Sequence, residues 1–180
     1  ESYKLFTKDN LKNPEFIRNV SYTNDNVYRW NTILRNHMIG RDLPLVTEAD
    51  IFTSYITIVD EFNDIVISNS SDYKVYQYRD YTDDYGLKTY AVNFVEFDSV
   101  FPTKTLQIID HKHAETFVKY KSIVAFLLKK AQTSSAAERG KHWKKYFNFI
   151  HSHLCMIDYK INVNGVETNI RKTIDYAYGT

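Results

Sequence analysis

The stretch "DYKVYQYRDYTDDYGLKTYAVNFVEF" (residues 72–97) decides the fold. Its flanks, "DYKVYQY" (72–78) and "LKTYAVNFVEF" (87–97), are rich in the β-branched and aromatic residues that favour strands. The intervening "DYTDDYG" (80–86) is rich in residues that form turns. Apolar residues alternate along both flanks, so each flank predicts a strand with one buried face, formed by Tyr73, Val75, Tyr90, Val92 and Phe94.

Two further segments of the same character precede this hairpin. They are "DIFTSYITIV" (50–59) and "DIVISN" (64–69), and the turn-forming stretches "DEFND" (60–64) and "NSSD" (69–72) follow them. Four short strands joined by tight turns predict a small antiparallel barrel or curled sheet.

The N-terminal part of the chain predicts a strand, a turn and a helix. "FIRNVSYT" (16–23) is typical of a short strand, and "TND" (23–25) offers side-chain acceptors for a helix N-cap. Apolar residues then recur at helical spacing, and Gly40 is the expected end of the helix. This unit is the building block of an α/β domain. The helical positions are Val27, Trp30, Leu34 and Met38.

After Pro102 the pattern becomes helical. One predicted helix has Asp110 as its candidate cap, and "AQTSSAAERG" (131–140) separates it from a second predicted helix. In "INVNGVETNI" (161–170) the Asn164-Gly165 pair predicts a hairpin, and a last strand is expected over residues 175–178. The expected stripes are Phe117, Tyr120, Val124, Leu127 and Ala131 on the first helix, and Trp143, Tyr146, Phe147, Ile150 and Leu154 on the second.

The order of these patterns indicates one domain inserted into another. We expect an α/β domain that opens over residues 1–42, a β-rich insertion over residues 43–110, and a helical extension over residues 111–156. A hairpin and a return strand over residues 157–180 would complete the first domain.

Composition narrows the class of protein. The 180 residues are 43% hydrophobic and 25% charged, as in ordinary globular proteins, and the single cysteine excludes an internal disulfide. No apolar run is long enough to span a bilayer and no secretory pattern opens the chain, so we expect a soluble cytoplasmic protein. Residues 47–98 carry eleven acidic and three basic residues, whereas residues 104–145 carry ten basic and three acidic ones. This asymmetry fits a surface that faces a polyanion, or two solvated faces.

Few residues are candidates for catalysis or metal binding. The chain has no Gly-rich phosphate loop, no serine in a nucleophile elbow and no zinc-type cysteine pair, so we expect no self-contained nucleotide site and no catalytic residue. Two His-x-His pairs occur, at His111 and His113 and at His151 and His153. Alternate residues on a helix point about 200° apart, so we expect surface or capping histidines there and no metal site.

The basic helical region is the candidate binding surface. "RGKHWKK" (139–145) places Lys141, Lys144 and Lys145 beside Trp143. Cations next to aromatic rings suit single-stranded nucleic acid, whose phosphates need neutralising and whose bases stack. The spacing predicts Trp143 in the core and the lysines on the opposite face.

Five segments, in order, resemble Dda-type and RecD-like superfamily 1B DNA helicases. "SYTNDNVYRWNTILR" (21–35) resembles their motif IV region, and "NDIVISNSSDYKVYQYRDYT" (63–82) resembles a strand pair in their SH3-like insertion. "KTLQIIDHKHAETFVKYKSIV" (104–124) is similar to the strand and helix that leave the insertion, and "GKHWKKYFNF" (140–149) to a later helix. "TIDYAYGT" (173–180) resembles the approach to motif V. The hairpin before this last segment departs from the family pattern.

The resemblance implies a piece of a RecA-like motor domain interrupted by an SH3-like antiparallel β-barrel insertion with added helices. It also implies that the chain, which begins at Glu1 and ends at Thr180, is cut from a longer ATP-dependent helicase of a bacterial host or a phage-infected cell. ATP and Mg²⁺ would bind the parent protein, whose first motor domain is missing here, so the chain alone should be inactive.

The resemblance further implies single-stranded DNA as the partner, with replication or recombination proteins as additional ones. Thr180 would be the first residue of motif V, and Thr23 and Asn24 match motif IV, although both could simply cap the helix. The alternative is a non-enzymatic nucleic-acid-binding or protein-recruiting module, because SH3-like barrels serve both purposes.

Overall fold

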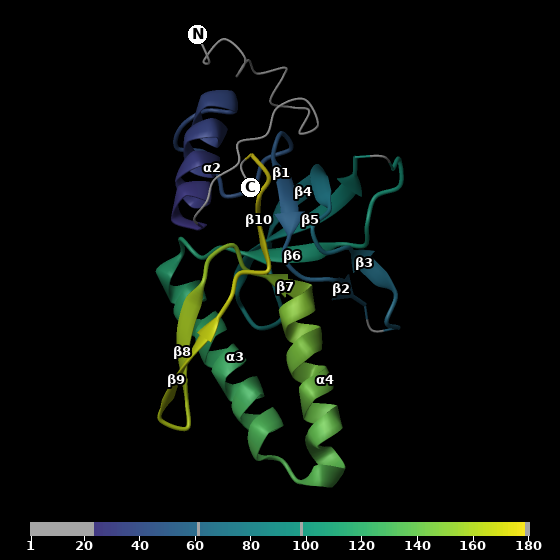
Figure 1. The fold of residues 1–180 in the computed structure, drawn as a ribbon, viewed down its shortest axis with the longest axis vertical. Helices are drawn as coiled ribbons and strands as arrows, with labels where there is room; N and C mark the ends of the chain where they lie inside the picture. The colour runs from purple at the N-terminus through teal and green to yellow at the C-terminus, as the bar shows by residue number, and fades with distance from the viewer. Residues whose placement is uncertain (1–23, 61, 98, 179–180) are drawn as a thin grey trace.

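In the computed structural model, which describes residues 24–60, 62–97 and 99–178, the protein is a mixed α/β molecule. A six-stranded sheet curls into a nearly closed barrel, and two long helices project from it (Figure 1). The expected strand at residues 16–23, together with Thr23 and Thr180, lies outside the described residues.

The hairpin predicted from residues 72–97 forms the centre of the sheet. Strand β4 (Asp72–Thr82) pairs antiparallel with β5 (Lys88–Glu96), with a bulge at Tyr76. Strand β4 continues four residues further toward the turn than the expected residues 72–78, whereas β5 begins one residue later than expected. The Asp83 carboxylate accepts a hydrogen bond from the Leu87 amide at 2.7 Å, and Gly86 supplies the positive φ of 68° that the turn needs. The predicted inward face is confirmed: Tyr73, Val75, Val92 and Phe94 are buried and Tyr90 is partly buried.

The remaining strands extend this hairpin on both sides. On one side β4 pairs with β1 (Ile51–Ser54), which pairs with β10 (Ile174–Tyr176), and both pairings are antiparallel. On the other side β5 pairs antiparallel with β6 (Leu106–Ile109), which pairs parallel with β7 (His153–Leu154). The strand order is therefore β10-β1-β4-β5-β6-β7.

The two outer strands of the sheet approach each other at a seam. The Cys155 carbonyl accepts hydrogen bonds from the Thr173 amide at 2.9 Å and from the Ile174 amide at 3.4 Å, while the Cys155 amide donates to the Thr173 hydroxyl at 2.9 Å. Because residues just after β7 bond to residues at the start of β10, the sheet almost closes on itself. Its interior is filled by fully buried apolar side chains, among them Phe52, Phe94, Ile108, Leu154 and Ile174.

The prediction of one strand over residues 50–59 is wrong. The chain leaves the sheet after Ser54, whose hydroxyl donates to the Ile56 carbonyl at 2.7 Å, while the Tyr55 amide donates to the Thr173 carbonyl at 2.9 Å. Residues Ile58–Val59 then form β2, which pairs with β3 (Ile65–Ile67) in a separate two-stranded sheet. Local hydrogen bonds to the seam thus divide an apparently continuous β segment.

Helix α2 (Asn24–Met38) confirms the helix predicted in the N-terminal part. Val27, Leu34 and Met38 are buried, Trp30 is partly buried, and the helix ends two residues before Gly40, whose φ is 133°. Its apolar side packs on Ile51 of β1 and on Ala177 and Tyr178, which follow β10.

Helices α3 (Ala114–Thr133) and α4 (Ala136–Ser152) pack side by side as a helical hairpin. The cap of α3 is His113 rather than Asp110: its Nδ1 accepts a hydrogen bond from the Thr116 amide at 3.2 Å. The buried stripe of α3 contains Leu128 where Leu127 was expected, and Leu127 is only partly buried. Helix α4 ends at Ser152, so His153 and Leu154 belong to β7 and not to the helix.

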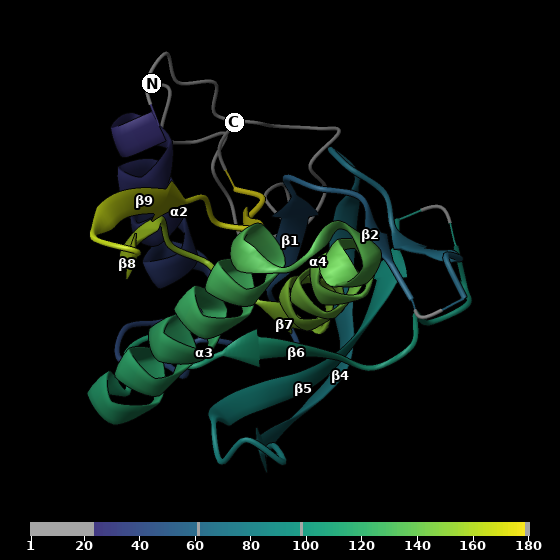
Figure 2. The same cartoon turned by 90° about the horizontal axis from the view of Figure 1, so that it is seen from below.

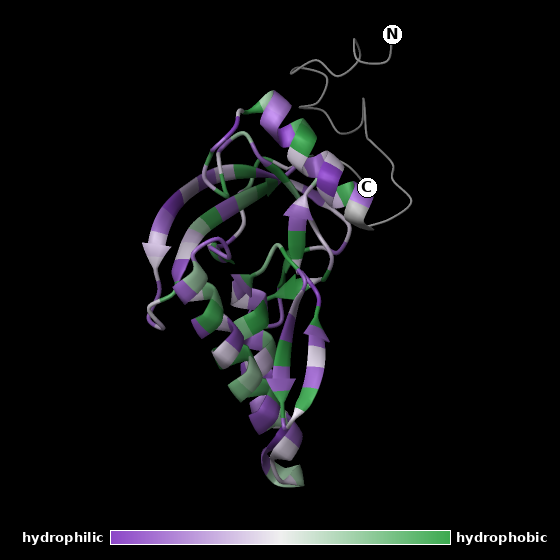
Figure 3. Ribbon diagram, turned by 90° about the vertical axis from the view of Figure 1, so that its left-hand side faces the viewer, coloured by the Kyte–Doolittle hydropathy of each residue, from purple (hydrophilic) through white to green (hydrophobic). Residues whose placement is uncertain are grey.

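A second hairpin packs on the other side of α3. Strands β8 (Tyr159–Val163) and β9 (Val166–Ile170) are joined by Asn164 and Gly165, whose φ values of 55° and 82° confirm the predicted turn. Buried and exposed residues alternate along β8. Figure 3 colours the ribbon by hydropathy and shows hydrophilic and hydrophobic bands along the hairpin. Viewed from below, α3 lies between this hairpin and α4 (Figure 2).

The fold prediction is thus confirmed at its coarser level, a mixed α/β chain with a barrel-like antiparallel sheet. Within the described residues the only parallel pairing is that of β6 with β7, and β10 joins the barrel sheet through β1. The assignment of the flanking segments to a RecA-like motor domain, with boundaries at residues 42, 110 and 156, stays a prediction.

Candidate nucleic-acid interface

The three predicted lysines share one face of α4. Lys141, Lys144 and Lys145 are all exposed, and at about 100° per residue they lie on one side of the helix together with Asn148. No ion pair within the described residues involves any of the three lysines. We call these four residues the α4 basic face. It offers exposed lysine ammonium groups that can neutralise the phosphates of a nucleic acid.

The opposite side of α4 carries Trp143 and Tyr146, as the spacing predicted, but the prediction that Phe147 belongs to the same buried stripe is wrong. Trp143 and Tyr146 are partly buried against the cluster formed with α3, and Phe149 and Ile150 are buried in it. The Trp143 ring stacks on Phe147 with centroids 5.6 Å apart, and Phe147 remains 48% exposed. Trp143 therefore anchors the helix from the rim of the core rather than from its centre.

A groove of about 310 Å³ continues the α4 basic face toward the barrel. Asn148 belongs to both surfaces, and Lys104 and Thr105 contribute polar groups from the segment that leads into β6. Lys104 forms an ion pair with Asp60, and this hydrogen bond lowers the pKa of the Asp60 carboxyl. The groove is lined by Val59, Asp60, Val66, Lys104, Thr105, Leu106, Asn148, His151 and Ser152.

His151 lies at the wall of this groove. Its Nδ1 accepts a hydrogen bond from the Val59 amide at 3.5 Å, which links α4 to β2. Burial lowers its pKa, although the hydrogen bond from Val59 acts in the opposite direction. Its imidazole is therefore neutral at pH 7 and works as a structural acceptor.

Of the other three predicted site residues, only Asn24 lies within the described part of the chain. Asn24 is the first residue of α2, while Thr23 and Thr180 lie outside the described residues. Helix α2 sits at the opposite end of the molecule from the tip of the α3–α4 hairpin (Figure 1). Asn24 is therefore far from the three lysines, which are the predicted site residues that the described part of the chain brings together.

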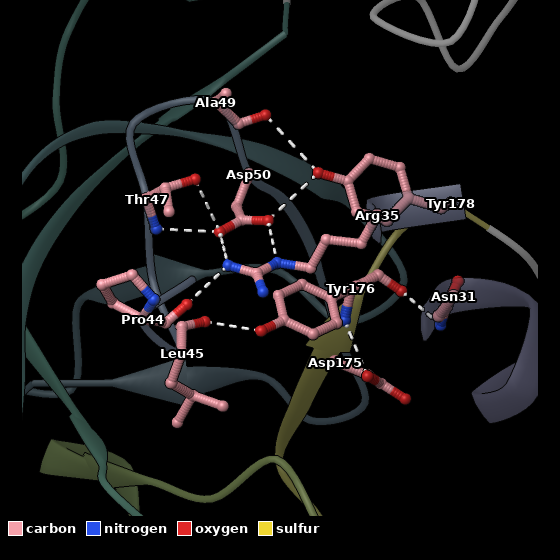
Figure 4. Close-up of polar contacts among 10 residues, drawn as sticks. All are labelled: Asn31, Arg35, Pro44, Leu45, Thr47, Ala49, Asp50, Asp175, Tyr176 and Tyr178. Atoms are coloured by element: carbon pink, nitrogen blue, oxygen red, sulfur yellow. Dashed lines mark hydrogen bonds and ion pairs between the residues drawn. The ribbon is translucent and has the colours of Figure 1, made fainter. Parts of the chain in front are cut away.

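A buried polar network, not predicted from the sequence, holds α2 and the end of β10 together. Arg35 of α2 forms an ion pair with Asp50 before β1, and the Tyr178 hydroxyl donates to the same carboxylate at 3.1 Å (Figure 4). The Asn31 amide donates to the Tyr176 carbonyl at 2.7 Å. Helix α2 is therefore bonded directly to the end of β10.

The sequence does contain a signal for this network. Asn31 and Arg35 occupy the same stripe of α2 as Val27, Leu34 and Met38, and buried polar groups require partners. Burial by itself would lower the pKa of the Arg35 guanidinium, but the hydrogen bond and charge of Asp50 outweigh it and raise that pKa. Arg35 is thus charged, and its ion pair fixes α2 relative to the segment before β1.

Three of the four histidines in the two pairs, His113, His151 and His153, have hydrogen-bond partners. His113 caps α3, as predicted for one of them, whereas His153 is buried, which a surface or capping role does not fit. The His153 Nε2 lies 2.9 Å from the Asp83 carboxylate, and its ring stacks on Phe149 with centroids 4.3 Å apart. Burial lowers the pKa of His153 even though Asp83 opposes this shift, so the neutral ring donates to Asp83 and ties β7 to the β4–β5 turn.

Two absences concern only the residues that the structure describes. They contain no group of three His, Cys, Asp or Glu side chains arranged to hold a metal ion. None of their helices combines the length and the apolar character needed to cross a membrane.

Comparison with known proteins identifies no relative: neither a protein-family model nor a curated protein matches the sequence.

Proposed function

We propose that this chain is the single-strand-gripping part of an ATP-dependent DNA helicase of the Dda-type and RecD-like kind. The observation that carries the proposal is the α4 basic face, on which Lys141, Lys144 and Lys145 point away from the aromatic side of the helix. Phosphate contacts of this kind supply most of the affinity of a protein for single strands.

The bonds between α2 and the end of β10 support the same assignment. Arg35 and Tyr178 meet on Asp50, and both belong to segments whose sequences resemble helicase motifs. In this proposal the two segments are parts of a RecA-like motor domain, and the barrel is an SH3-like insertion within it. Thr23, Asn24 and Thr180 would contact the DNA backbone.

ATP hydrolysis belongs to the parent protein in this proposal. The first motor domain of the parent would supply the phosphate-binding loop and bind ATP and Mg²⁺, and closure of the cleft between the motor domains would move the strand across the α4 basic face. The 180-residue chain alone should not hydrolyse ATP, so a magnesium-dependent ATPase activity of the purified chain would contradict this division of labour.

Fluorescence anisotropy with a labelled oligo-dT strand tests the DNA contact. Reversing all three lysines in Lys141→Glu, Lys144→Glu and Lys145→Glu should weaken binding by roughly tenfold or more at low salt, because three attractive interactions with phosphate become repulsive. The slope of log affinity against log salt should become shallower by about 2, at roughly 0.7 for each phosphate of the single strand that is no longer neutralised.

The matched control changes the net charge by the same amount elsewhere. Lys74, Arg79 and Lys88 are exposed on the β4–β5 hairpin, and reversing all three should leave the affinity close to that of the unchanged chain. Equal reductions of affinity in the two triple variants would show that only overall charge matters and would refute a specific role of α4.

A protein-recruiting module is the second candidate, favoured by one observation. Phe62 and Ile65, in and beside the β2–β3 hairpin, are 71% and 66% exposed, which is unusual for large apolar side chains near each other in sequence. Oligo-dT binding that does not respond to the α4 substitutions would favour this candidate. This candidate would also be favoured if peptides from a library bind the unchanged chain but do not bind the Phe62→Ser, Ile65→Ser variant.

A further inference from the structure

A large groove lies on the other side of α3 from α4. Its volume is about 1020 Å³, and it lies between α3, the β8–β9 hairpin and the segment that follows β1. This size reaches the upper end of the range of about 300–1,000 Å³ that is usual for ligand pockets. The groove is lined by Tyr55, Ile56, Lys121, Asp158, Tyr159, Lys160, Asn169, Ile170, Arg171 and Lys172.

Basic residues outnumber acidic ones in the lining of the groove. Four of its ten lining residues are lysine or arginine, and its one acidic residue, Asp158, accepts a hydrogen bond from the Lys172 amide at 2.8 Å. Lys172 and Lys160 are already paired with Asp175 and Glu167.

The two other cations of the groove are not neutralised in this way. Among the described residues, no ion pair links Lys121 or Arg171 to a carboxylate. The Lys121 ammonium lies 5.1 Å from the centre of the Phe117 ring. Such a contact attracts the ammonium but does not neutralise its charge. The groove therefore holds two positive charges that an anion could neutralise.

One wall of the groove is an exposed aromatic ring. Tyr55 is 42% exposed, and the Lys172 ammonium lies 4.9 Å from the centre of its ring. Burial raises the pKa of its hydroxyl, so Tyr55 is uncharged at neutral pH and does not repel phosphate. An exposed ring in the same groove as two cations without a carboxylate partner is the combination that single-stranded nucleic acid uses, with bases stacked on rings and phosphates on lysine or arginine.

We propose that this groove binds single-stranded nucleic acid, with phosphates at Lys121 and Arg171 and a base against Tyr55. This inference rests on the proposed function and deepens it, because it places a second stretch of the strand on the opposite side of α3 from the α4 basic face. A duplex keeps its bases paired inside, so it cannot place one against Tyr55. A free nucleotide carries the same chemistry, and the experiment separates the two sources.

The test uses the whole 180-residue chain and labelled oligo-dT in anisotropy titrations at several salt concentrations. Neutralising Lys121→Gln together with Arg171→Gln should make the salt slope shallower by about 1.4, at roughly 0.7 for each of the two phosphates, and should weaken binding about tenfold at low salt. The matched control, Arg79→Gln with Lys88→Gln, removes the same two kinds of charge from the exposed β4–β5 hairpin and should change neither quantity.

A second measurement follows the stacked base. Ultraviolet cross-linking of oligo-dT, located by mass spectrometry, should mark Tyr55, should persist in Tyr55→Phe and should disappear in Tyr55→Ala. Thermal melts followed by circular dichroism identify any unfolded variant. If Tyr55→Ala does not fold, the cross-link in the unchanged chain and in Tyr55→Phe still decides the base contact.

The outcomes separate this inference from the proposed function. An unchanged slope in the Lys121 and Arg171 variant, with weaker binding in the α4 triple variant, overturns the groove and leaves the α4 face in place. The reverse pattern supports the groove and removes the α4 face. Competition by dTMP at concentrations similar to those of oligo-dT, counted in nucleotides, or equally tight binding of a duplex overturns the assignment to a strand.

Discussion

Arg35 and Asp50 form a two-pronged ion pair inside the protein. The Arg35 Nε lies 2.7 Å from one carboxylate oxygen of Asp50 and the Nη2 lies 2.9 Å from the other, with the side chains 7% and 0% exposed. Further hydrogen bonds support the pair: Nη2 also donates to the Pro44 carbonyl, and the Thr47 amide donates to Asp50 at 2.8 Å. Such hydrogen bonds are what makes a buried charge tolerable.

Removing one partner of this pair should be strongly destabilising. Asp50→Asn leaves the Arg35 charge buried without its counterion, and we expect the free energy of unfolding to fall by about 3–5 kcal/mol. Urea denaturation followed by circular dichroism measures this loss. The double variant Arg35→Met, Asp50→Asn should lose less than the sum of the two single variants, because no buried charge is then left alone.

The matched comparison for this prediction is an exposed pair. Lys160 and Glu167 lie 2.6 Å apart across β8 and β9, with side chains 62% and 64% exposed. Lys160→Met should cost less than about 1 kcal/mol. A loss in Asp50→Asn no larger than this one would contradict the role assigned to the network.

Stability should fall as the pH drops below about 6.5, the usual pKa of an unfolded histidine. Burial lowers the pKa of His153, and also those of His111 and His151, so the unfolded chain takes up protons at a pH where the folded chain does not. Each such group contributes at most about 1.4 kcal/mol per pH unit between its folded pKa and 6.5.

One buried acid acts with the opposite sign. Burial raises the pKa of Asp175, so this group favours the folded state at low pH and loses that contribution as the pH rises above 3.8 toward its folded value.

The contribution of His153 to the pH dependence of stability is isolated by urea denaturation at pH 5, 6 and 7 of the unchanged chain and of His153→Gln. The variant should show the weaker pH dependence between pH 5 and 6.5, and identical dependences would rule out the assignment.

Two glycines should respond to alanine in opposite directions. Gly165 has a φ of 82° in the β8–β9 turn, and an added Cβ would meet no atom within 4 Å, so Gly165→Ala should cost about 1–2 kcal/mol through backbone conformation alone. Gly140 lies in α4 with equally open space, and Gly140→Ala should stabilise by about 0.5–1 kcal/mol. Thermal and urea denaturation of both variants check the pair of signs. A destabilising Gly140→Ala would indicate that α4 begins elsewhere.

Most of the secondary structure could be predicted from patterns that span only a few residues. The alternation around Val92, the helical spacing from Val27 to Met38 and the Asn164-Gly165 turn each act over a few residues, and each was predicted. The α4 basic face was predicted for the same reason, since a helix fixes the relative directions of Lys141 and Trp143 once its period is known.

The features that escaped prediction depend on residues distant in sequence. Asp83 and His153 are 70 positions apart, and the seam between Cys155 and Thr173 decides that β1 ends at Ser54. The groove at Tyr55 requires α3 and the β8–β9 hairpin to pack together, and no local period encodes that packing.

The seam at Cys155 and Thr173 also has a consequence for the order in which the chain can fold. Strand β1 pairs with β4 on one side and with β10 on the other, and β10 is the last of the described strands to leave the ribosome. Until it arrives, β1 presents an open edge next to Phe52, the kind of edge that recruits strands from other chains. Shortened chains that stop before Thr173 should therefore aggregate. The nascent protein needs β10 to cover the edge of β1 before that edge is protected from pairing with other chains.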